Sequence, residues 1–217
     1  MPIMAQGTQR RAGVPAEFAS LPMRTVTSAL AASVYARPAP QLARMAREGV
    51  LHRVARGYYV VVPAEHVGSG WIPTLEAAAA GIGAADFGPD HAILMGLSAA
   101  RMHGALPRAI ATAIVAVPRQ RAAITIADRD SLVRFVVRHV DRLDVESMVT
   151  ELGRATVTTP EQTVLDLARR PSLGGAPDEA RAAAGVLLPR CDRQVLERLA
   201  IEQHMRATLI RLPTWAK

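Results

Sequence analysis

The residues best suited to chemistry are a glutamine and several arginines at helical spacing near the amino end. Gln41, Arg44 and Glu48 recur at i, i+3 and i+7, so they share one face of a predicted helix, with Arg47 at the border of that face. Arginine can make bidentate contacts with guanine, and glutamine with adenine, when a helix carries them into the major groove. We therefore take Gln41 and Arg44 as candidates for reading bases.

Other side chains near this helix are suited to phosphate contacts, which set affinity and register on a duplex but carry little sequence information. These candidates lie near helix ends or on a predicted β-turn, and they are Thr27, Arg37, Arg47, Arg53 and Arg56. The alternative for each one alone is an ordinary solvated position. A single module buries only about 600 to 1,000 Å² on DNA, so we expect two copies on repeated or inverted half-sites of double-stranded DNA.

The distribution of charge favours a polyanion as partner. Residues 1–62 contain eight arginines and only two acids, a net charge of +6, whereas residues 63–217 contain 18 basic and 17 acidic side chains, a net charge of +1. Such an asymmetry is typical of a basic module joined to a near-neutral body.

Three short helices followed by a hairpin are predicted in the basic part. We expect helices from Ala16, over Thr25–Tyr35, and from Pro40 to a stop at Gly49. Two β-prone runs, 50–54 and 58–62, then flank an Ala-Arg-Gly turn. This order predicts a winged helix-turn-helix domain over residues 1–62, followed by a linker over 63–70.

Residues 71–217 predict a larger α+β domain with a small sheet and C-terminal helices. The expected helices are 73–85, 92–102, 159–168, 178–188 and 193–211. The β-prone stretches are 110–117, 123–127, 132–139 and 145–157. Thr159-Pro-Glu-Gln162 has the pattern of a capping box, with proline at the first helical position.

Composition excludes several classes of protein. Half of the residues are apolar and 21% are charged, which is a globular mixture. The single cysteine, Cys191, excludes an intrachain disulfide and a cysteine-based zinc site. The first residues have no apolar core of a signal peptide, and the longest apolar run, 109–118, is about half of a membrane span. We expect a cytoplasmic protein with no membrane partner.

Several short motifs are weak evidence for catalysis. Asp86-Phe-Gly88 matches a magnesium-binding tripeptide of protein kinases, but the other kinase motifs are missing, so a turn is the better explanation. Asp128 and Asp130 are better explained as turn residues, and His103 as a residue at a helix end. The histidines contain no close ligand pair. We predict no catalytic residue, no metal and no cofactor.

Four sequence blocks together resemble the AbiEi family of antitoxins from type IV toxin–antitoxin pairs. The first is the N-terminal stretch that ends in Leu42-Ala-Arg-Met-Ala-Arg-Glu-Gly-Val-Leu51, and the second is Arg53-Val-Ala-Arg-Gly-Tyr-Tyr-Val60. The others are Leu97-Ser-Ala-Ala-Arg-Met-His-Gly104 and Thr158-Thr-Pro-Glu-Gln-Thr-Val-Leu-Asp-Leu-Ala168. The blocks span about residues 15 to 170. The chain departs from the family in having Pro38 and Pro40 at the entrance of the predicted recognition helix.

The resemblance implies a DNA-binding repressor of its own operon, whose second domain helps to neutralise a nucleotidyltransferase-like toxin. The alternative is an antitoxin that acts mainly through residues 71–217 on the toxin, by direct binding or by covalent modification such as phosphoryl transfer. Whether the protein is an enzyme stays open between these two hypotheses.

Overall fold

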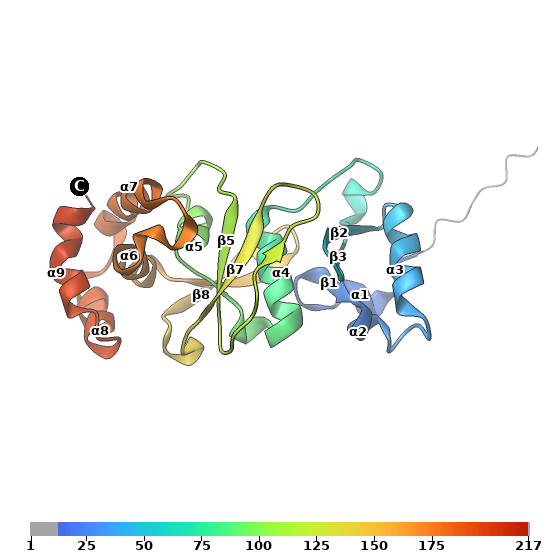
Figure 1. The fold of residues 1–217 in the computed structure, drawn as a ribbon, viewed down its shortest axis with the longest axis horizontal. Helices are drawn as coiled ribbons and strands as arrows, with labels where there is room; N and C mark the ends of the chain where they lie inside the picture. The colour runs from blue at the N-terminus through green and yellow to red at the C-terminus, as the bar shows by residue number, and fades with distance from the viewer. Residues whose placement is uncertain (1–12, 217) are drawn as a thin grey trace, which may run out of the picture.

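The computed structural model describes residues 13–216. The first twelve residues of the predicted N-terminal domain, which include Arg10 and Arg11, therefore lie outside the described part. Figure 1 shows three successive parts along the long axis: a small N-terminal module, a central sheet, and a group of C-terminal helices at the opposite end. The α+β class predicted from the sequence is confirmed.

The N-terminal module consists of short helices around a three-stranded sheet with the order β1-β3-β2. Its elements are α1 (Ala16–Ala19), a 3-10 turn (Pro22–Arg24), β1 (Thr25–Thr27), α2 (Ser28–Ala31), α3 (Pro38–Arg47), β2 (Leu51–Ala55) and β3 (Tyr58–Val61). A separate apolar cluster that includes Phe18, Val26, Leu42 and Met45 fills the space between α3 and the sheet.

The predicted helix over 25–35 is wrong at both ends. Thr25, Val26 and Thr27 form strand β1, which pairs antiparallel with β3, because β-branched side chains favour extended backbone. The Thr27 side chain then accepts a hydrogen bond from the backbone N–H of Leu30 and caps the short helix α2. That helix ends at Ala31.

Helix α3 and the hairpin follow the sequence pattern closely. The helix begins at Pro38, two residues before the predicted start. Proline fits the first position of a helix, and Arg37, the residue before it, has a non-helical backbone conformation. Gly49 follows the helix with a φ of +73°, which favours glycine and stops the helix as predicted. Gly57 turns the hairpin with a φ of +87°.

The body contains a six-stranded mixed sheet with the order β6-β7-β5-β4-β9-β8. The strands are β4 (Ile93–Leu94), β5 (Thr112–Val117), β6 (Ile124–Thr125), β7 (Leu132–Val137), β8 (Val145–Thr150) and β9 (Gly153–Thr158). The pairs β4/β9 and β5/β7 are parallel, and the other pairs are antiparallel. The sheet is therefore larger and less local than the small sheet predicted.

Six helices complete the described part of the body. They are α4 (Leu75–Phe87), α5 (Leu97–Met102), α6 (Pro160–Arg169), α7 (Pro177–Leu187), α8 (Arg193–Glu202) and α9 (Arg206–Trp215). The predicted helix over 92–102 is wrong in its first part, where β4 forms. The predicted helix over 193–211 is two helices, because His204 takes a φ of +56° between them. Thr159 caps α6 through the N–H of Gln162, as the capping box predicted.

The two faces of the large sheet pack against different layers. Along β5, Ala113, Val115 and Val117 point to the side that carries α4, whereas Ile114 and Ala116 point to the helices α5 to α9. The layer on the α4 side also contains Met23, Val54 and Tyr58 from the N-terminal module. The module and the body therefore share one apolar core.

No helix among residues 13–216 combines the length and the apolar character needed to cross a membrane.

Candidate nucleic-acid interface

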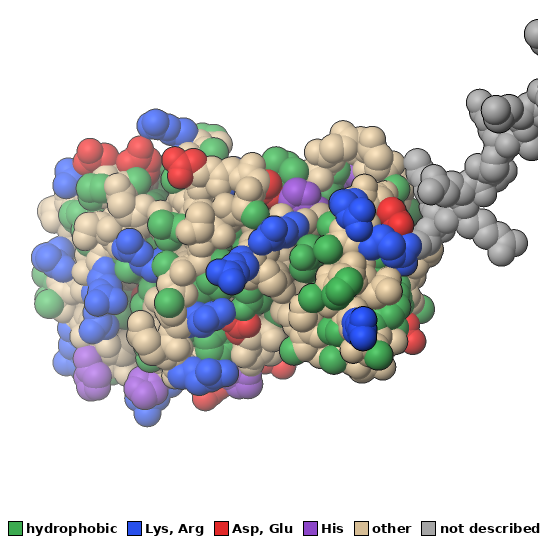
Figure 2. All heavy atoms as spheres, turned by 45° about the vertical axis from the view of Figure 1, so that its right-hand side comes forward, with side chains coloured by type: hydrophobic (Ala, Val, Ile, Leu, Met, Phe, Trp, Pro, Cys, Tyr) green, Lys and Arg blue, Asp and Glu red, His purple; other side chains and the backbone are tan. Residues whose placement is uncertain are grey.

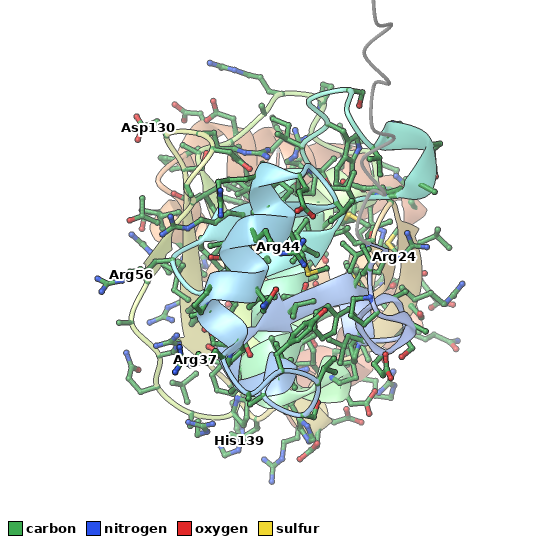
Figure 3. The ribbon with its side chains drawn as sticks, turned by 90° about the vertical axis from the view of Figure 1, so that its right-hand side faces the viewer. Arg24, Arg37, Arg44, Arg56, Asp130 and His139 are labelled. Carbon is green, nitrogen blue, oxygen red and sulfur yellow. The ribbon has the colours of Figure 1, made fainter. Side chains whose placement is uncertain are left out.

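Helix α3 crosses the free end of the N-terminal module, where Figure 3 views it from outside. Its inner side is fixed by Leu42 and Met45, which are completely buried. Because residues three and four positions apart lie on one face of a helix, this burial leaves Gln41, Arg44 and Glu48 on the outer side.

The structure brings the two predicted base-reading residues together. The Arg44 Nε donates to Gln41 Oε1 at 3.3 Å, and its Nη1 donates to Glu48 Oε1 at 2.8 Å. The Arg44 side chain remains 44% exposed. A guanidinium has five N–H donors, so this pairing holds Arg44 in place and still leaves donors for a ligand.

The predicted phosphate contacts come from β1, from α3 and the residue before it, and from the hairpin, all in the N-terminal module, where Figure 2 shows several basic side chains at the surface. Arg37, Arg47, Arg53 and Arg56 are exposed, and within residues 13–216 no hydrogen bond or ion pair engages their side chains. Figure 3 shows Arg37 and Arg56 beside α3 at the same end of the molecule as Arg44. Unpaired arginines leave their full charge available to a polyanion.

Thr27 has a structural task at the edge of this surface. It is half-buried, and its Oγ1 accepts the N–H of Leu30 at 3.3 Å. Its hydroxyl hydrogen remains able to donate. Arg24 was not among the predicted site residues, but it also lies at this end of the molecule (Figure 3) and is half-buried with a φ of +47°.

Two polar clusters join the hairpin to the body. In the first, the ring Nε2 of His52 on β2 lies 2.5 Å from Asp128 Oδ2, and Arg129 Nε donates to Asp128 Oδ1 at 2.6 Å. Burial alone would raise the pKa of Asp128, but the hydrogen bonds and charges of Arg129 and His52 outweigh it and lower that pKa. Ala127 N–H also donates to the Val54 carbonyl at 2.8 Å.

The second cluster involves the other strand of the hairpin, β3. The Tyr58 hydroxyl donates to Asp86 Oδ1 at 2.7 Å, and Arg121 donates to both Asp86 Oδ2 and the Tyr58 oxygen at 2.8 Å. Burial and the neighbouring Asp86 raise the pKa of Tyr58, although Arg121 opposes them. Arg53 and Arg56 therefore lie on a hairpin whose two strands are both anchored to the body.

The two polar clusters show that Asp86 and Asp128, which were interpreted as turn residues, have structural contacts. Asp86 of the Asp-Phe-Gly tripeptide is not a simple turn residue, because it lies in the last turn of α4 and binds Tyr58 and Arg121. Asp128 is likewise not a simple surface turn residue, since only 11% of its side chain is exposed. His103 does end α5, as predicted, and its Nε2 lies 2.7 Å from the Thr158 carbonyl oxygen.

Other chemistry has little support in the described residues. Within 13–216, no three histidine, cysteine or carboxylate side chains are grouped so that they could hold a metal ion. Burial raises the pKa of the Cys191 thiol to about 12, so this cysteine is a poor nucleophile at neutral pH.

The molecule is thus an α+β protein with a small cationic module at one end and a larger body. A protein-family model described as the AbiEi antitoxin C-terminal domain matches residues 91–214, which is more than half of the chain. The chain belongs to the AbiEi antitoxin family. The family model is that of an antitoxin from toxin–antitoxin pairs.

A solved structure supports the same fold. The crystal structure of the RV2827C protein from Mycobacterium tuberculosis is similar, with a TM-score of 0.53 and 20% sequence identity over 81% of this chain. The chain spans 66% of the length of that protein. Among curated proteins, no sequence matches this chain.

Proposed function

We propose that this antitoxin binds operator DNA and represses its own operon. Its N-terminal module acts as a winged helix-turn-helix, with α3 as the recognition helix and the β2–β3 hairpin as the wing. The observation that carries the proposal is the Gln41–Arg44 pair on the outer side of α3, together with four exposed arginines of the same module that make no ion pair among residues 13–216.

Each residue has a distinct role in this proposal. Arg44 and Gln41 read base edges in the major groove. A helix that buries its other side can enter the groove so that these two side chains face the bases. Arg37, Arg47, Arg53 and Arg56, with Thr27, bind phosphates. Two copies of the chain occupy repeated or inverted half-sites, because one module covers too little DNA for tight binding. Repression places this work in the cytoplasm.

Fluorescence anisotropy with the duplex upstream of the operon tests this function, with a scrambled duplex of equal length as reference. We expect the protein to prefer its own duplex and Arg47→Ala to weaken binding to both duplexes. Arg181→Ala is the matched control, because this exposed arginine lies on α7 at the opposite end of the molecule (Figure 1). Equal affinity of the wild-type protein for both duplexes would contradict operator binding.

We also propose that the body acts directly on a nucleotidyltransferase-like toxin. The match to the antitoxin family lies at residues 91–214 and so falls within the body, which favours a role of the body beyond support of the wing. Contact and covalent modification of the toxin, such as phosphoryl transfer, are the two modes to be distinguished.

A variant that does not repress separates this role from repression. Arg53→Glu and Arg56→Glu together reverse the charge of the wing without touching the shared core. The toxin and this double variant are expressed from unrelated promoters. Protection equal to that of the wild-type chain supports direct action, and loss of protection opposes it. Mass spectrometry of the toxin from the same cells shows whether it has been modified.

A further inference from the structure

Two adjoining hollows lie on the body at the carboxyl end of β7, away from the interface described above. The smaller has a volume of about 290 Å³ and is lined by Arg138, Asp166, Arg169 and Arg170, with apolar walls that include Val136 and Leu173. The larger, of about 350 Å³, shares Arg138 and Arg169 with it and adds residues from the turn after β7 and from the end of α8.

Asp166 gives the smaller hollow an unusual polar group. Its side chain is 2% exposed, and its Oδ1 accepts from Arg138 Nη1 at 2.8 Å. Within residues 13–216, its Oδ2 has no hydrogen-bond partner. Burial raises the pKa of Asp166, while Arg138 and, more weakly, Gln162 act in the opposite direction. A buried carboxylate oxygen without a donor is costly, so a donor supplied by a ligand would stabilise it.

The arginines of the hollows leave positive charge uncompensated. Arg142, Arg169 and Arg170 are exposed, and in the described part of the chain no ion pair engages their side chains. Glu202, the acid of the larger hollow, is already bound to Arg198 at 3.2 Å.

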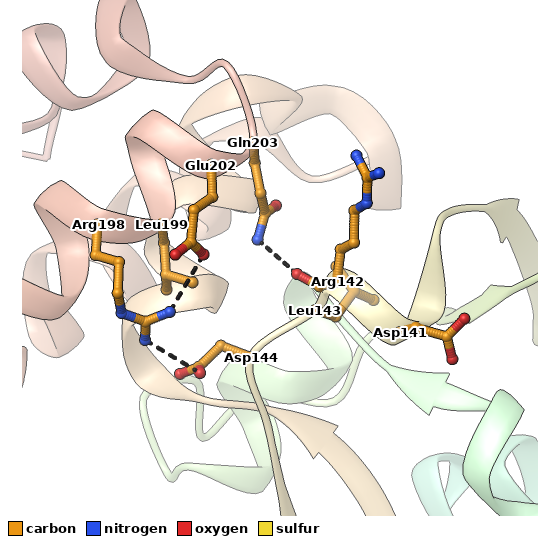
Figure 4. A pocket seen from close by; sticks show the side chains of 8 residues that line it. All are labelled: Asp141, Arg142, Leu143, Asp144, Arg198, Leu199, Glu202 and Gln203. Atoms are coloured by element: carbon orange, nitrogen blue, oxygen red, sulfur yellow. Dashed lines mark hydrogen bonds and ion pairs between the residues drawn. The ribbon is translucent and has the colours of Figure 1, made fainter.

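Figure 4 shows this arrangement in a neighbouring hollow of about 520 Å³, where Arg198 spans Asp144 and Glu202. The backbone carbonyl of Arg142 accepts a hydrogen bond from Gln203 there.

The last-turn position of Arg169 on α6 accounts for part of this cluster. Cations near a helix C-terminus are favourable because the terminal carbonyls carry partial negative charge. Arg138 and Arg142, however, come from the end of β7 and from the following 3-10 turn (Val140–Arg142). The arginines therefore converge from separate elements, which a single helix end does not explain.

We propose that the two hollows bind a nucleoside phosphate. Arginines bind phosphate oxygens through bidentate, charge-assisted hydrogen bonds. An N–H group of the base donates to Asp166 Oδ2, and the apolar walls at Val136 and Leu173 pack against the ring. The larger hollow falls within the range of small-ligand sites, about 300 to 1,000 Å³, and the smaller one adjoins it. This inference does not depend on the proposed DNA binding.

Isothermal titration calorimetry of the full chain with ATP, GTP and inorganic phosphate tests the site. We expect saturable binding of at least one nucleotide, and Arg169→Ala to weaken it about tenfold or more, which is the size of effect that loss of a charged hydrogen bond produces. Arg181→Ala, which removes the same charge outside the hollows, should leave nucleotide binding unchanged.

Three results would overturn the proposal. They are the absence of saturable binding, equal losses in Arg169→Ala and Arg181→Ala, and inorganic phosphate binding as tightly as the nucleotides. A further test is whether a DNA duplex competes with the nucleotide. If it competes as strongly in the variant Arg53→Glu/Arg56→Glu as in the wild type, the hollows belong to a DNA-binding surface and the proposal is opposed.

Asp166→Asn provides an independent measurement. The amide keeps the shape of the carboxylate but has lost an acceptor, so we expect the nucleotide affinity to fall more than the phosphate affinity. Thermal unfolding of the same sample shows whether the variant is folded. If Asp166→Asn is unfolded, the nucleotide affinity of Arg169→Ala decides the proposal. Equal affinity of Asp166→Asn and wild type for nucleotide would contradict the role of Asp166.

Discussion

Arg44 and Arg47 are neighbours on α3, but their surroundings differ. Arg44 is held by Gln41 and Glu48 on its own helix, whereas the side chain of Arg47 is free of ion pairs among residues 13–216. An arginine in a fixed orientation suits base reading, and an exposed arginine without an acidic partner suits phosphate. The helical period alone was enough to bring Gln41, Arg44 and Glu48 together, because all three lie within two turns.

The two arginines should therefore respond differently to truncation. Arg44→Ala should weaken binding to the operator by about 1 to 3 kcal/mol and leave binding to a scrambled duplex nearly unchanged. Arg47→Ala should weaken both equally and lower the slope of log K against log salt by about one. Anisotropy titrations at several salt concentrations measure both effects. An Arg44→Ala variant that retains its preference for the operator contradicts the assignment.

Asp128 gives a prediction for the pH dependence of stability. Folding lowers the pKa of Asp128, so its ionised form stabilises the folded protein. This stabilisation is fully present above the ordinary pKa of an aspartate, about 4, and is lost as the pH falls through the lower pKa of the folded state. Asp128→Asn should thus reduce the free energy of unfolding by about 1 to 3 kcal/mol at pH 7. The difference from wild type should shrink in acid. Urea unfolding from pH 7 to pH 3 measures it, and a difference that is constant with pH opposes this role.

The contacts of Asp128 and Asp86 could not be predicted from spacing. Tyr58 and Asp86 are separated by 28 positions, and Asp86 and Arg121 by 35. Only the packing of the hairpin against α4 brings these groups together. Asp86 was noted in the sequence only because Asp-Phe-Gly resembles a magnesium-binding motif. No nearby residue indicated that it contacts Tyr58 and Arg121.

Among the elements, the hairpin was predicted well, whereas two strands were missed. Glycine at a positive φ marks the hairpin turn, so its position is visible in the sequence. Strand β1 was hidden in a run of apolar residues at helical spacing. Strand β4 has only two residues, and the apolar segment that follows it into α5 has no alternation to distinguish strand from helix.

The anchored hairpin predicts that Tyr58 positions the wing. Tyr58→Phe keeps the ring but removes the hydroxyl that binds Asp86 and Arg121. We expect operator affinity to fall severalfold, because Arg56 is less well placed. In the double variant Tyr58→Phe/Arg56→Ala, the loss of operator affinity should be smaller than the sum of the two single losses. This is expected when one residue acts through the other.

Anisotropy titrations of the two single variants and the double variant complete this cycle. A purely structural role of Tyr58 would give additive losses, and that result would refute positioning. Thermal unfolding of each variant verifies that the fold is intact.

Over the whole molecule, the shared core links the DNA-binding proposal to the body. Met23, Val54, Ala55, Tyr58 and Val60 pack in one cluster with α4 and the large sheet. The predicted boundaries, 1–62 and 71–217, stay a prediction, but they divide residues that bury apolar surface together. The sequence indicated two patterns of elements and could not show that their cores join, because that depends on contacts between distant segments.

We therefore expect residues 1–70 alone to lack a cooperative fold. Separation would expose the apolar side chains that now face α4, and the module would keep only the small cluster around Phe18, Leu42 and Met45, which is little core for a chain of this size. Circular dichroism during heating should show a broad, shallow change for the fragment and a sharp transition for the full chain. A sharp transition of the fragment at the same temperature as the full chain would show that the module is independent.

The central claim is that the cationic end of this antitoxin recognises a particular duplex. The most direct measurement is the affinity of the full chain for its own upstream duplex and for a scrambled duplex, at physiological salt. We predict that its own duplex binds about a thousandfold tighter or more, and that both affinities fall as salt increases. Equal affinities for the two duplexes, or no dependence on salt, would contradict the claim.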